Sequence, residues 1–350
     1  MRGCSLFSGA GIAETFLADL GINIVAANEI IERRANLYRS LNQNVNVVIG
    51  DIWDKRVFKN LIDAVSGRIN VLIATPPCQG ISVAGKNRRQ DEFEEDERNY
   101  LIFKVIEFIH KKEPDYILIE NVPLFLELSL PRKNKLYRAQ DLLVKEFKDK
   151  YSVEAAVINS ALYGIPQTRK RAIIKLYKKG LNWGWPTESK IVTTKKAIGH
   201  LPSLEAGERS KIPWHYARNH IDRHVLWMRN TPTGKSAYDN RKYYPQKEDG
   251  TPIKGYKSSY RRIRWDVPAP SITIRNDAIS SQRNVHPGRK LKDGTYSDAR
   301  VLTPLELMLL TSLPANWNIP VNTPEILLRQ CIGESIPPLL VKKLMDCIGC

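Results

Sequence analysis

Short apolar runs alternate with amphipathic stretches through the first half of the chain. Seven runs have the length and composition of buried strands: Gly3–Phe7, Ile22–Ala27, Val45–Ile49, Val71–Thr75, Tyr116–Glu120, Val153–Asn159 and Arg171–Tyr177. Five stretches with helical spacing accompany them: Ala13–Leu20, Arg33–Leu41, Val57–Val65, Asn99–Lys111 and Arg138–Lys148. This alternation predicts an α/β fold in which a parallel sheet carries helices on both faces.

The alternating pattern breaks near Lys179. From there to about Pro320 the sequence is rich in Pro, Gly and aromatic residues, with short β-like pieces such as Pro270–Arg275. A helical pattern returns in Pro304–Thr311 and Pro337–Met345. We therefore expect a second, smaller and irregular β-containing domain inserted before the end of the chain.

Length and composition are those of a chain with a large core. Of 350 residues, 42% are hydrophobic, and no run approaches the roughly 18 apolar residues of a membrane helix. No signal peptide is visible in the first residues, and the five scattered cysteines form no disulfide framework. We expect a cytoplasmic protein with reduced thiols, associated with the nucleoid if it binds DNA, and with no membrane partner.

Positive charge is concentrated in the irregular segment. The formal net charge is +17, and residues 181–300 hold 23 Lys and Arg against 11 Asp and Glu, a net of +12. Five of the seven tryptophans lie in the same segment. Basic residues mixed with aromatics favour a nucleic-acid partner, although a solvated basic surface has the same composition.

Three strand ends in the first part of the sheet have the residues of a nucleotide-cofactor site. The first strand runs into the glycine-containing turn Phe7–Gly11, where the backbone can approach a ligand. Glu14 stands where a dinucleotide fingerprint requires glycine, which disfavours NAD. Glu29 ends the second strand and Asp51 follows the third, where carboxylates can accept ribose hydroxyls and an adenine amino group.

Three further groups lie at the same edge of the predicted sheet. Cys78 follows the fourth strand in the sequence Pro76-Pro77-Cys78-Gln79, and Glu120 ends the fifth strand. Gln167-Thr168-Arg169-Lys170-Arg171 precedes the last strand. Each alone is typical of a turn or a cap, but together they place a nucleophile, an acid and cations at one edge.

In these motifs the sequence resembles the cytosine-5 DNA methyltransferase family of bacterial restriction–modification systems. The matching residues run in order along almost the whole chain: Leu6–Gly11, Asn28-Glu29, Gly50-Asp51-Ile52, Pro77-Cys78-Gln79, Arg98 with Leu101, Glu120-Asn121-Val122, Gln167/Arg169/Arg171, Arg300 through Leu302-Thr303-Pro304 and Glu306, and Gly333-Glu334-Ser335. The resemblance implies a Rossmann-like catalytic domain, residues 1–179 completed by 322–350, and a target-recognition domain, residues 180–321.

The implied activity is methyl transfer from S-adenosylmethionine to carbon 5 of a cytosine flipped out of a specific double-stranded DNA sequence. Cys78 would add to carbon 6, which makes carbon 5 nucleophilic, and Glu120 would serve ring nitrogen 3. Arg171 or Arg169 would reach oxygen 2. Implied cofactor residues are Phe7, Ser8, Gly9, Ala10, Gly11, Glu29, Ile30, Asp51, Ile52, Pro76, Leu101, Glu334 and Ser335, and implied DNA contacts are Gln79, Ser82, Arg261, Arg262 and Arg264.

The chain departs from the family pattern at four positions. Ser5 stands where the first motif usually begins with Asp, Ile12 replaces a Gly, Ile81 replaces a Phe, and Glu334 replaces an Asn that helps position the cofactor. None of these is the expected nucleophile or its acid, so we expect an active enzyme.

Three other functions share some of these sequence features. An exocyclic-amine methyltransferase would carry Tyr or Phe after Pro-Pro, so Cys78 argues against it. The tRNA-modifying branch of the same family remains an alternative, as does a non-catalytic DNA-binding regulator, which would be expected to lack Cys78 or Glu120. The Cys347/Cys350 pair alone does not predict a metal site. We expect a monomer that acts on double-stranded DNA; a cognate restriction endonuclease for the same site is a candidate partner, with no direct contact implied, and the sequence does not determine whether one accompanies the protein.

Overall fold

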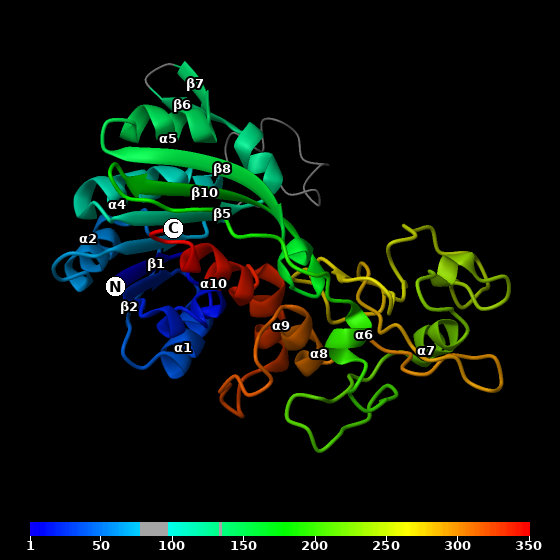
Figure 1. Cartoon of the computed structure of the whole chain (residues 1–350). Coiled ribbons are helices and arrows are strands. Elements are labelled where there is room, and N and C mark those ends of the chain that lie inside the picture. Colours follow the sequence, from blue (N-terminus) through cyan, green and yellow to red (C-terminus); the bar gives the residue numbers. More distant parts are fainter. Residues whose placement is uncertain (78–96, 133–134) are drawn as a thin grey trace. The chain divides into compact units, whose positions relative to one another are not determined.

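The computed structural model describes residues 1–77, 97–132 and 135–350 (Figure 1). The chain divides into two compact units. The first consists of Met1–Asn159, Lys170–Thr187 and Pro338–Cys350, and the second consists of Ser160–Arg169 and Glu188–Pro337. No helix within the described residues is long and apolar enough to cross a membrane.

A seven-stranded sheet in the order β3-β2-β1-β4-β5-β10-β8 forms the centre of the first unit. Its strands are β1 (Arg2–Leu6), β2 (Asn23–Glu29), β3 (Asn46–Ile49), β4 (Val71–Ala74), β5 (Tyr116–Asn121), β8 (Tyr151–Asn159) and β10 (Lys170–Lys178). All seven predicted strands are confirmed. The strands from β3 to β5 pair in parallel, so β1, β2, β4 and β5 end at one edge of the sheet.

The prediction of a parallel sheet is wrong for the last two strands. β10 runs antiparallel to both β5 and β8. Only the ten residues Ser160–Arg169 connect β8 to β10, fewer than the dozen or so that a parallel crossover needs. The antiparallel direction of β10 brings its first residues to the edge at which β5 ends, because Ala172 pairs with Asn121.

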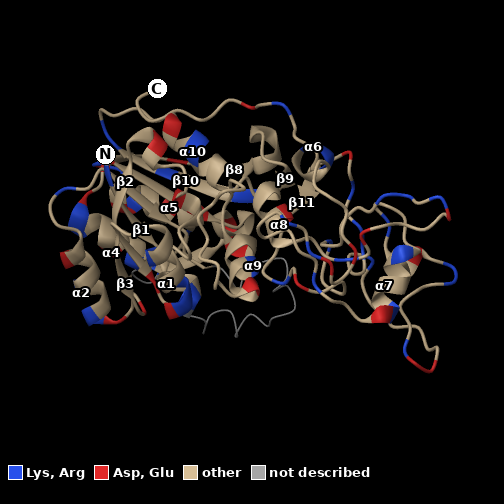
Figure 2. Cartoon of the chain, turned by 90° about the horizontal axis from the view of Figure 1, so that it is seen from below, with Lys and Arg blue, Asp and Glu red and all other residues tan. Residues whose placement is uncertain are grey.

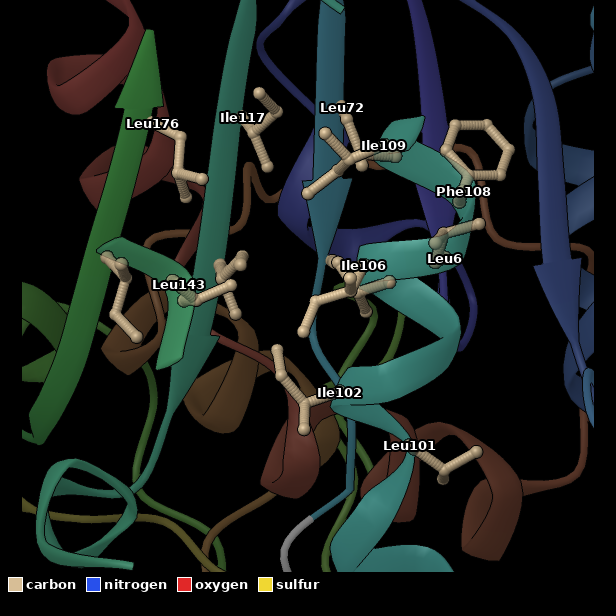
Figure 3. Packing of buried hydrophobic residues seen from close by; sticks show 14 of the residues in the cluster. Leu6, Leu72, Leu101, Ile102, Ile106, Phe108, Ile109, Ile117, Leu143 and Leu176 are labelled. Carbon is tan, nitrogen blue, oxygen red and sulfur yellow. The ribbon is translucent and has the colours of Figure 1, made fainter. Parts of the chain in front are cut away.

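Helices cover both faces of the sheet. In the first unit they are α1 (Glu32–Leu41), α2 (Lys55–Ala64), α4 (Ile102–Lys112), α5 (Ala139–Phe147) and α10 (Pro338–Asp346). One core packs α2, α4 and α5 against the strands, with Leu6, Leu72, Ile117 and Leu176 from the sheet meeting Ile106 and Ile109 of α4 (Figure 3). On the other face Tyr38 of α1 packs with Ala27 and Val47, and α10 contacts the segment after β1.

The segment after β1 is not the helix predicted over Ala13–Leu20. It contains two short 3-10 turns, η1 (Ile12–Glu14) and η2 (Ala18–Leu20). The hydroxyl of Thr15 donates to the carbonyl of Ile12 at 2.8 Å and competes there with the helical ladder. The backbone after Gly11 therefore forms short turns instead of a regular α-helix.

The second unit is mostly irregular, as its composition predicts. Its helices are α6 (Thr194–Ile198), α7 (Asp222–Arg229), α8 (Pro304–Leu310) and α9 (Glu325–Glu334), and its two-residue strands β9 (Gln167–Thr168) and β11 (Ala269–Pro270) pair in parallel. The β-like stretch expected over Pro270–Arg275 is thus reduced to its first residue, and α6, α7 and α9 were not predicted. Two hairpin strands of the first unit, β6 (Ser129–Arg132) and β7 (Lys135–Arg138), were also not predicted.

Candidate active site

The Phe7–Gly11 turn leaves one glycine facing open space. Phe7, Gly9 and Gly11 adopt left-handed backbone conformations, with φ of 59°, 55° and 76°. A Cβ on Gly9 would meet no atom of the described residues within 4 Å, whereas a Cβ on Gly11 would lie 2.8 Å from the ring of Tyr38. Ser8 fastens the turn to β2, because its N–H and its hydroxyl both donate to the carbonyl of Asn28 at 3.0 and 3.2 Å. Gly9 can therefore be approached by a ligand, and Gly11 is held from behind.

Glu29 connects the ends of β1 and β2. Its buried carboxylate accepts the N–H of Gly9 through Oε2 and the N–H of Ile31 through Oε1, both at 2.9 Å. The next side chain, Ile30, is apolar but 59% exposed. An acidic group that orders the glycine turn thus stands next to an apolar surface open to a ligand.

The end of β3 supplies a second carboxylate. Asn28 donates to the carbonyls of Val48 and Gly50 at 3.0 and 3.1 Å and so ties β2 to the turn after β3. Asp51 in that turn is exposed, and its Oδ1 accepts the N–H of Trp53 at 2.9 Å. Ile52 is buried in the core.

The chain leading to Cys78 is fixed by the neighbouring strand end. Asn121, which ends β5, donates from Nδ2 to the carbonyl of Pro76 at 3.0 Å and accepts the N–H of Val122 at 2.8 Å. The Thr75 hydroxyl donates to the carbonyl of Phe7 at 3.0 Å. Cys78, Gln79 and Ser82 lie outside the described residues. The described chain nevertheless delivers residue 77 to the edge where β4 and β5 end.

Glu120 and Arg171 form an ion pair at the same edge. Nε of Arg171 lies 2.7 Å from Oε1 of Glu120, and both side chains are largely buried. The N–H geometry is not that of a hydrogen bond, and among the described residues Oε1 of Glu120 has no hydrogen-bond donor. Nη1 of Arg171 donates to the carbonyl of Lys170 at 2.8 Å. The pair presents an acid beside a fixed cation, with hydrogen-bonding capacity left for another molecule.

Arg169 has a different environment within the second unit. Its Nη1 donates to the carbonyls of Ile272 and Gly333 at 2.8 and 3.2 Å, and its Nη2 donates to the carbonyl of Glu334 at 2.8 Å. Burial of this guanidinium among carbonyl groups ties the end of α9 to the segment after β11. The sequence did not decide whether Arg169 or Arg171 would act at oxygen 2 of the cytosine. Of these two arginines, only Arg171 contacts Glu120.

The remaining predicted cofactor residues occupy mixed environments. Ala10, Pro76 and Leu101 are buried in the first unit. In the second unit Glu334 is an exposed side chain at the end of α9, and the hydroxyl of Ser335 donates to the carbonyl of Cys331 at 2.7 Å.

The basic segment around Trp265 contains arginines of opposite kinds. Arg262 is 0% exposed and donates to the carbonyls of Met228, His286 and Asp298. Arg264 is exposed and paired with Asp266, and Arg261 is half-buried, with Nη1 donating to the carbonyl of Lys257 at 3.3 Å. Figure 2 shows further basic residues along the loops around α6 and α7. A side chain as buried as Arg262 cannot contact a duplex in this conformation.

Two groups of buried polar residues have hydrogen-bond roles that the sequence did not predict, although Glu14, Arg300 and Glu306 were named there in other connections. Glu14 accepts hydrogen bonds from the hydroxyls of Ser5 and Tyr38. In the second unit the buried Arg300 donates to Asp298 and Glu306. The opposite charges of this buried network therefore compensate one another. The Thr303-x-x-Glu306 spacing of a capping box, which the structure forms at the start of α8, was the available signal for the second group. No group of metal-ligating side chains occurs among the described residues.

The strand order, the glycine turn and the carboxylates at the strand ends together define a Rossmann-like methyltransferase fold. The profile of the C-5 cytosine-specific DNA methylase family matches residues 1–350. The chain is 57% identical over 345 residues to the Type II methyltransferase M1.HgaI of Avibacterium volantium, with 98% of this chain and 97% of the relative covered. It is 29% identical to the Type II methyltransferase M1.HphI of Haemophilus parahaemolyticus, with 98% and 85% covered.

The chain belongs to the C-5 cytosine-specific DNA methylase family and is a DNA (cytosine-5)-methyltransferase of the restriction–modification type. Among solved structures, the Entamoeba histolytica methyltransferase EhMeth matches with a TM-score of 0.63 and 16% identity over 99% of this chain and 97% of that one. At that identity the likeness shows the shared fold alone. The predicted fold class and family are confirmed.

Proposed function

We propose that this enzyme methylates carbon 5 of a cytosine flipped out of a specific double-stranded DNA sequence, with S-adenosylmethionine as donor and Cys78 as covalent nucleophile. The observation that supports this most strongly is the Glu120–Arg171 pair at 2.7 Å. It lies at the strand edge to which Asn121 also holds Pro76, two residues before Cys78. An acid, a cation and a cysteine at one edge are the groups that this chemistry requires.

The ends of β1, β2 and β3 fit S-adenosylmethionine. Gly9 faces open space, and Ile30 offers an exposed apolar surface suited to an adenine ring. A carboxylate can accept about four hydrogen bonds, so Glu29 can bind ribose hydroxyls while it holds two backbone N–H groups. We assign the adenine amino group to Asp51, whose carboxylate is exposed. When bound, the cofactor supplies an electrophilic methyl group.

The residues of this chain would act on the cytosine ring as follows. The thiolate of Cys78 adds to carbon 6, and Glu120 gives a proton to ring nitrogen 3, so the electron pair of the double bond becomes available at carbon 5. Arg171 holds the carboxylate and brings positive charge to the oxygen 2 side of the ring. After methylation of carbon 5, a base takes the proton from that carbon, and its electron pair re-forms the double bond to carbon 6 as the thiolate leaves. The carbon–sulfur bond breaks in that step, and nitrogen 3 returns its proton.

Sequence choice is proposed for the irregular segment, residues 180–321, and catalysis for residues 1–179 with 322–350. The compact units divide the chain differently, since residues 322–337 belong to the second unit, so this boundary rests on the family resemblance. The proposed DNA contacts are Arg261, Arg264, Gln79 and Ser82. Arg262 is not proposed to contact DNA because its side chain is buried. Arg169 is proposed to hold the second unit rather than the cytosine.

Methylation assays of paired variants test the proposal. DNA from cells expressing the enzyme should carry 5-methylcytosine at one sequence context, as read by bisulfite sequencing and nucleoside mass spectrometry. Glu120→Gln should lower the rate by roughly two to four orders of magnitude, the usual range for general acid–base catalysis. Lys170→Gln, which removes one exposed charge beside Arg171, serves as control and should keep the rate. Methylation of tRNA but not of DNA would instead establish the alternative substrate.

A further inference from the structure

A buried carboxylic acid lies directly behind the glycine turn. Glu14 ends η1, and its backbone N–H donates to the carbonyl of Gly11 at 3.2 Å, so it closes the turn. Its side chain is almost fully buried. None of the steps assigned to Cys78, Glu120 or Arg171 uses it.

Both carboxylate oxygens of Glu14 are occupied. Oε1 accepts the hydroxyl of Ser5 on β1, and Oε2 accepts the hydroxyl of Tyr38 on α1. One carboxylate therefore joins three elements that meet beneath the turn. Two hydroxyl donors and no acceptor suit the ionised form, although burial raises the pKa of Glu14 to about 7.

Tyr38 transmits this arrangement to the glycine turn. Its ring fills the space behind Gly11, where an added Cβ would come within 2.8 Å of Cε2. The same ring packs with Ala27 and Val47, so the hydroxyl held by Glu14 sets the ring against both the sheet and the turn. A shift of the ring would move Gly11, and Gly11 is bonded to Ser8 through its N–H at 2.9 Å.

Ser5 explains why a carboxylate is needed here. In the family resemblance drawn from the sequence, Ser5 stands where this motif usually begins with aspartate. The Ser5 hydroxyl contacts the Glu14 carboxylate, so the acidic group adjoins the position that an aspartate side chain would occupy.

We propose that Glu14 is a positioning residue for the cofactor: held by Ser5 and Tyr38, it fixes the Gly9–Gly11 turn and replaces the aspartate usual at position 5. The inference rests on the proposed binding of S-adenosylmethionine by this turn.

The test measures the dissociation constant for S-adenosylmethionine by calorimetry, together with KM, kcat and the melting temperature. Glu14→Ala and Tyr38→Phe should each weaken cofactor binding, the first on the order of 10-fold or more, as for lost support of binding groups. The kcat at saturating cofactor and the DNA affinity should stay near those of the wild type. Val105→Ala, a core change in α4 on the opposite face, is the control for destabilisation and should leave cofactor affinity unchanged.

The double substitution gives the sharper result. Ser5→Asp alone places two carboxyl groups in one buried site and should weaken binding, because like charges there repel. Adding Glu14→Ser should restore affinity to within about 3-fold of the wild type, a coupling expected only for side chains that share one task. The inference is overturned if Glu14→Ala binds cofactor normally, or if the double variant is no better than Ser5→Asp. A wild type that binds no S-adenosylmethionine would instead refute the proposed function.

Discussion

Replacing Arg262 by methionine should destabilise the second unit strongly, whereas replacing Arg264 by methionine should leave its stability nearly unchanged. The two arginines are separated by one residue in the same basic segment. Arg262 is completely buried, and Arg264 is exposed and, within the part of the chain that the structure describes, paired only with Asp266. The two variants therefore remove the same charge from opposite environments.

The expected loss follows from the hydrogen bonds that disappear. Arg262 donates to the carbonyls of Met228, His286, Asp298 and Tyr296. At about 1 kcal/mol net for each carbonyl left without its donor, the free energy of unfolding should fall by roughly 4 kcal/mol. For a unit of this size each kcal/mol shifts the melting temperature by about 2–4 °C, so a loss of roughly 10 °C is expected.

Calorimetric unfolding and DNA titrations at several salt concentrations separate the two roles. Arg264→Met should melt within about 1 °C of the wild type, and it should bind DNA more weakly with a shallower salt dependence, as expected for a lost phosphate or base contact. An Arg262→Met variant with an unchanged melting temperature but weakened DNA binding would show that this side chain faces the duplex, and the reasoning from its burial would be refuted.

Two further predictions concern the cofactor edge. Glu29→Ala and Asp51→Ala should each weaken S-adenosylmethionine binding in calorimetry and leave DNA affinity intact. Weakened DNA binding with unchanged cofactor affinity would show that neither residue belongs to the cofactor site. Burial raises the pKa of Glu14 from 4.5 to about 7, so its favourable contribution to stability is complete below pH 4.5 and is lost as pH rises through 7. Unfolding measured from roughly pH 5 to 8 should therefore show Glu14→Gln gaining about 3 kcal/mol relative to the wild type, and parallel curves would contradict the buried carboxylic acid.

Much of the catalytic sheet follows from the sequence because its signals are local. Continuous apolar runs locate all seven strands, and the polar residues at the strand ends, such as Glu29 and Glu120, are brought to one edge by parallel pairing. The direction of β10 could not be obtained this way, because it depends on a short connection and not on the strand's own pattern.

Side-chain roles that depend on burial in the tertiary structure could not be predicted from the sequence. Arg262 looks like Arg261 and Arg264 in a basic run, yet only its position inside the second unit decides that it binds carbonyls. Glu14 was used only to disfavour a dinucleotide fingerprint, since no spacing reveals that Tyr38 would reach it from α1. Local patterns thus predict the elements and the strand-end chemistry, and long-range contacts determine which polar residues support them.

The most direct test of the account is mechanism-based trapping at Cys78. The enzyme is incubated with S-adenosylmethionine and duplex DNA that carries 5-fluorocytosine at the mapped target. Fluorine cannot leave carbon 5 as a cation, so the final elimination stops. A denaturation-resistant protein–DNA adduct is expected, located at Cys78 by peptide mass spectrometry and absent in Cys78→Ala, which should still bind the duplex. Absence of an adduct with wild-type enzyme that methylates normal DNA, or an active Cys78→Ala variant, would contradict covalent catalysis by this cysteine.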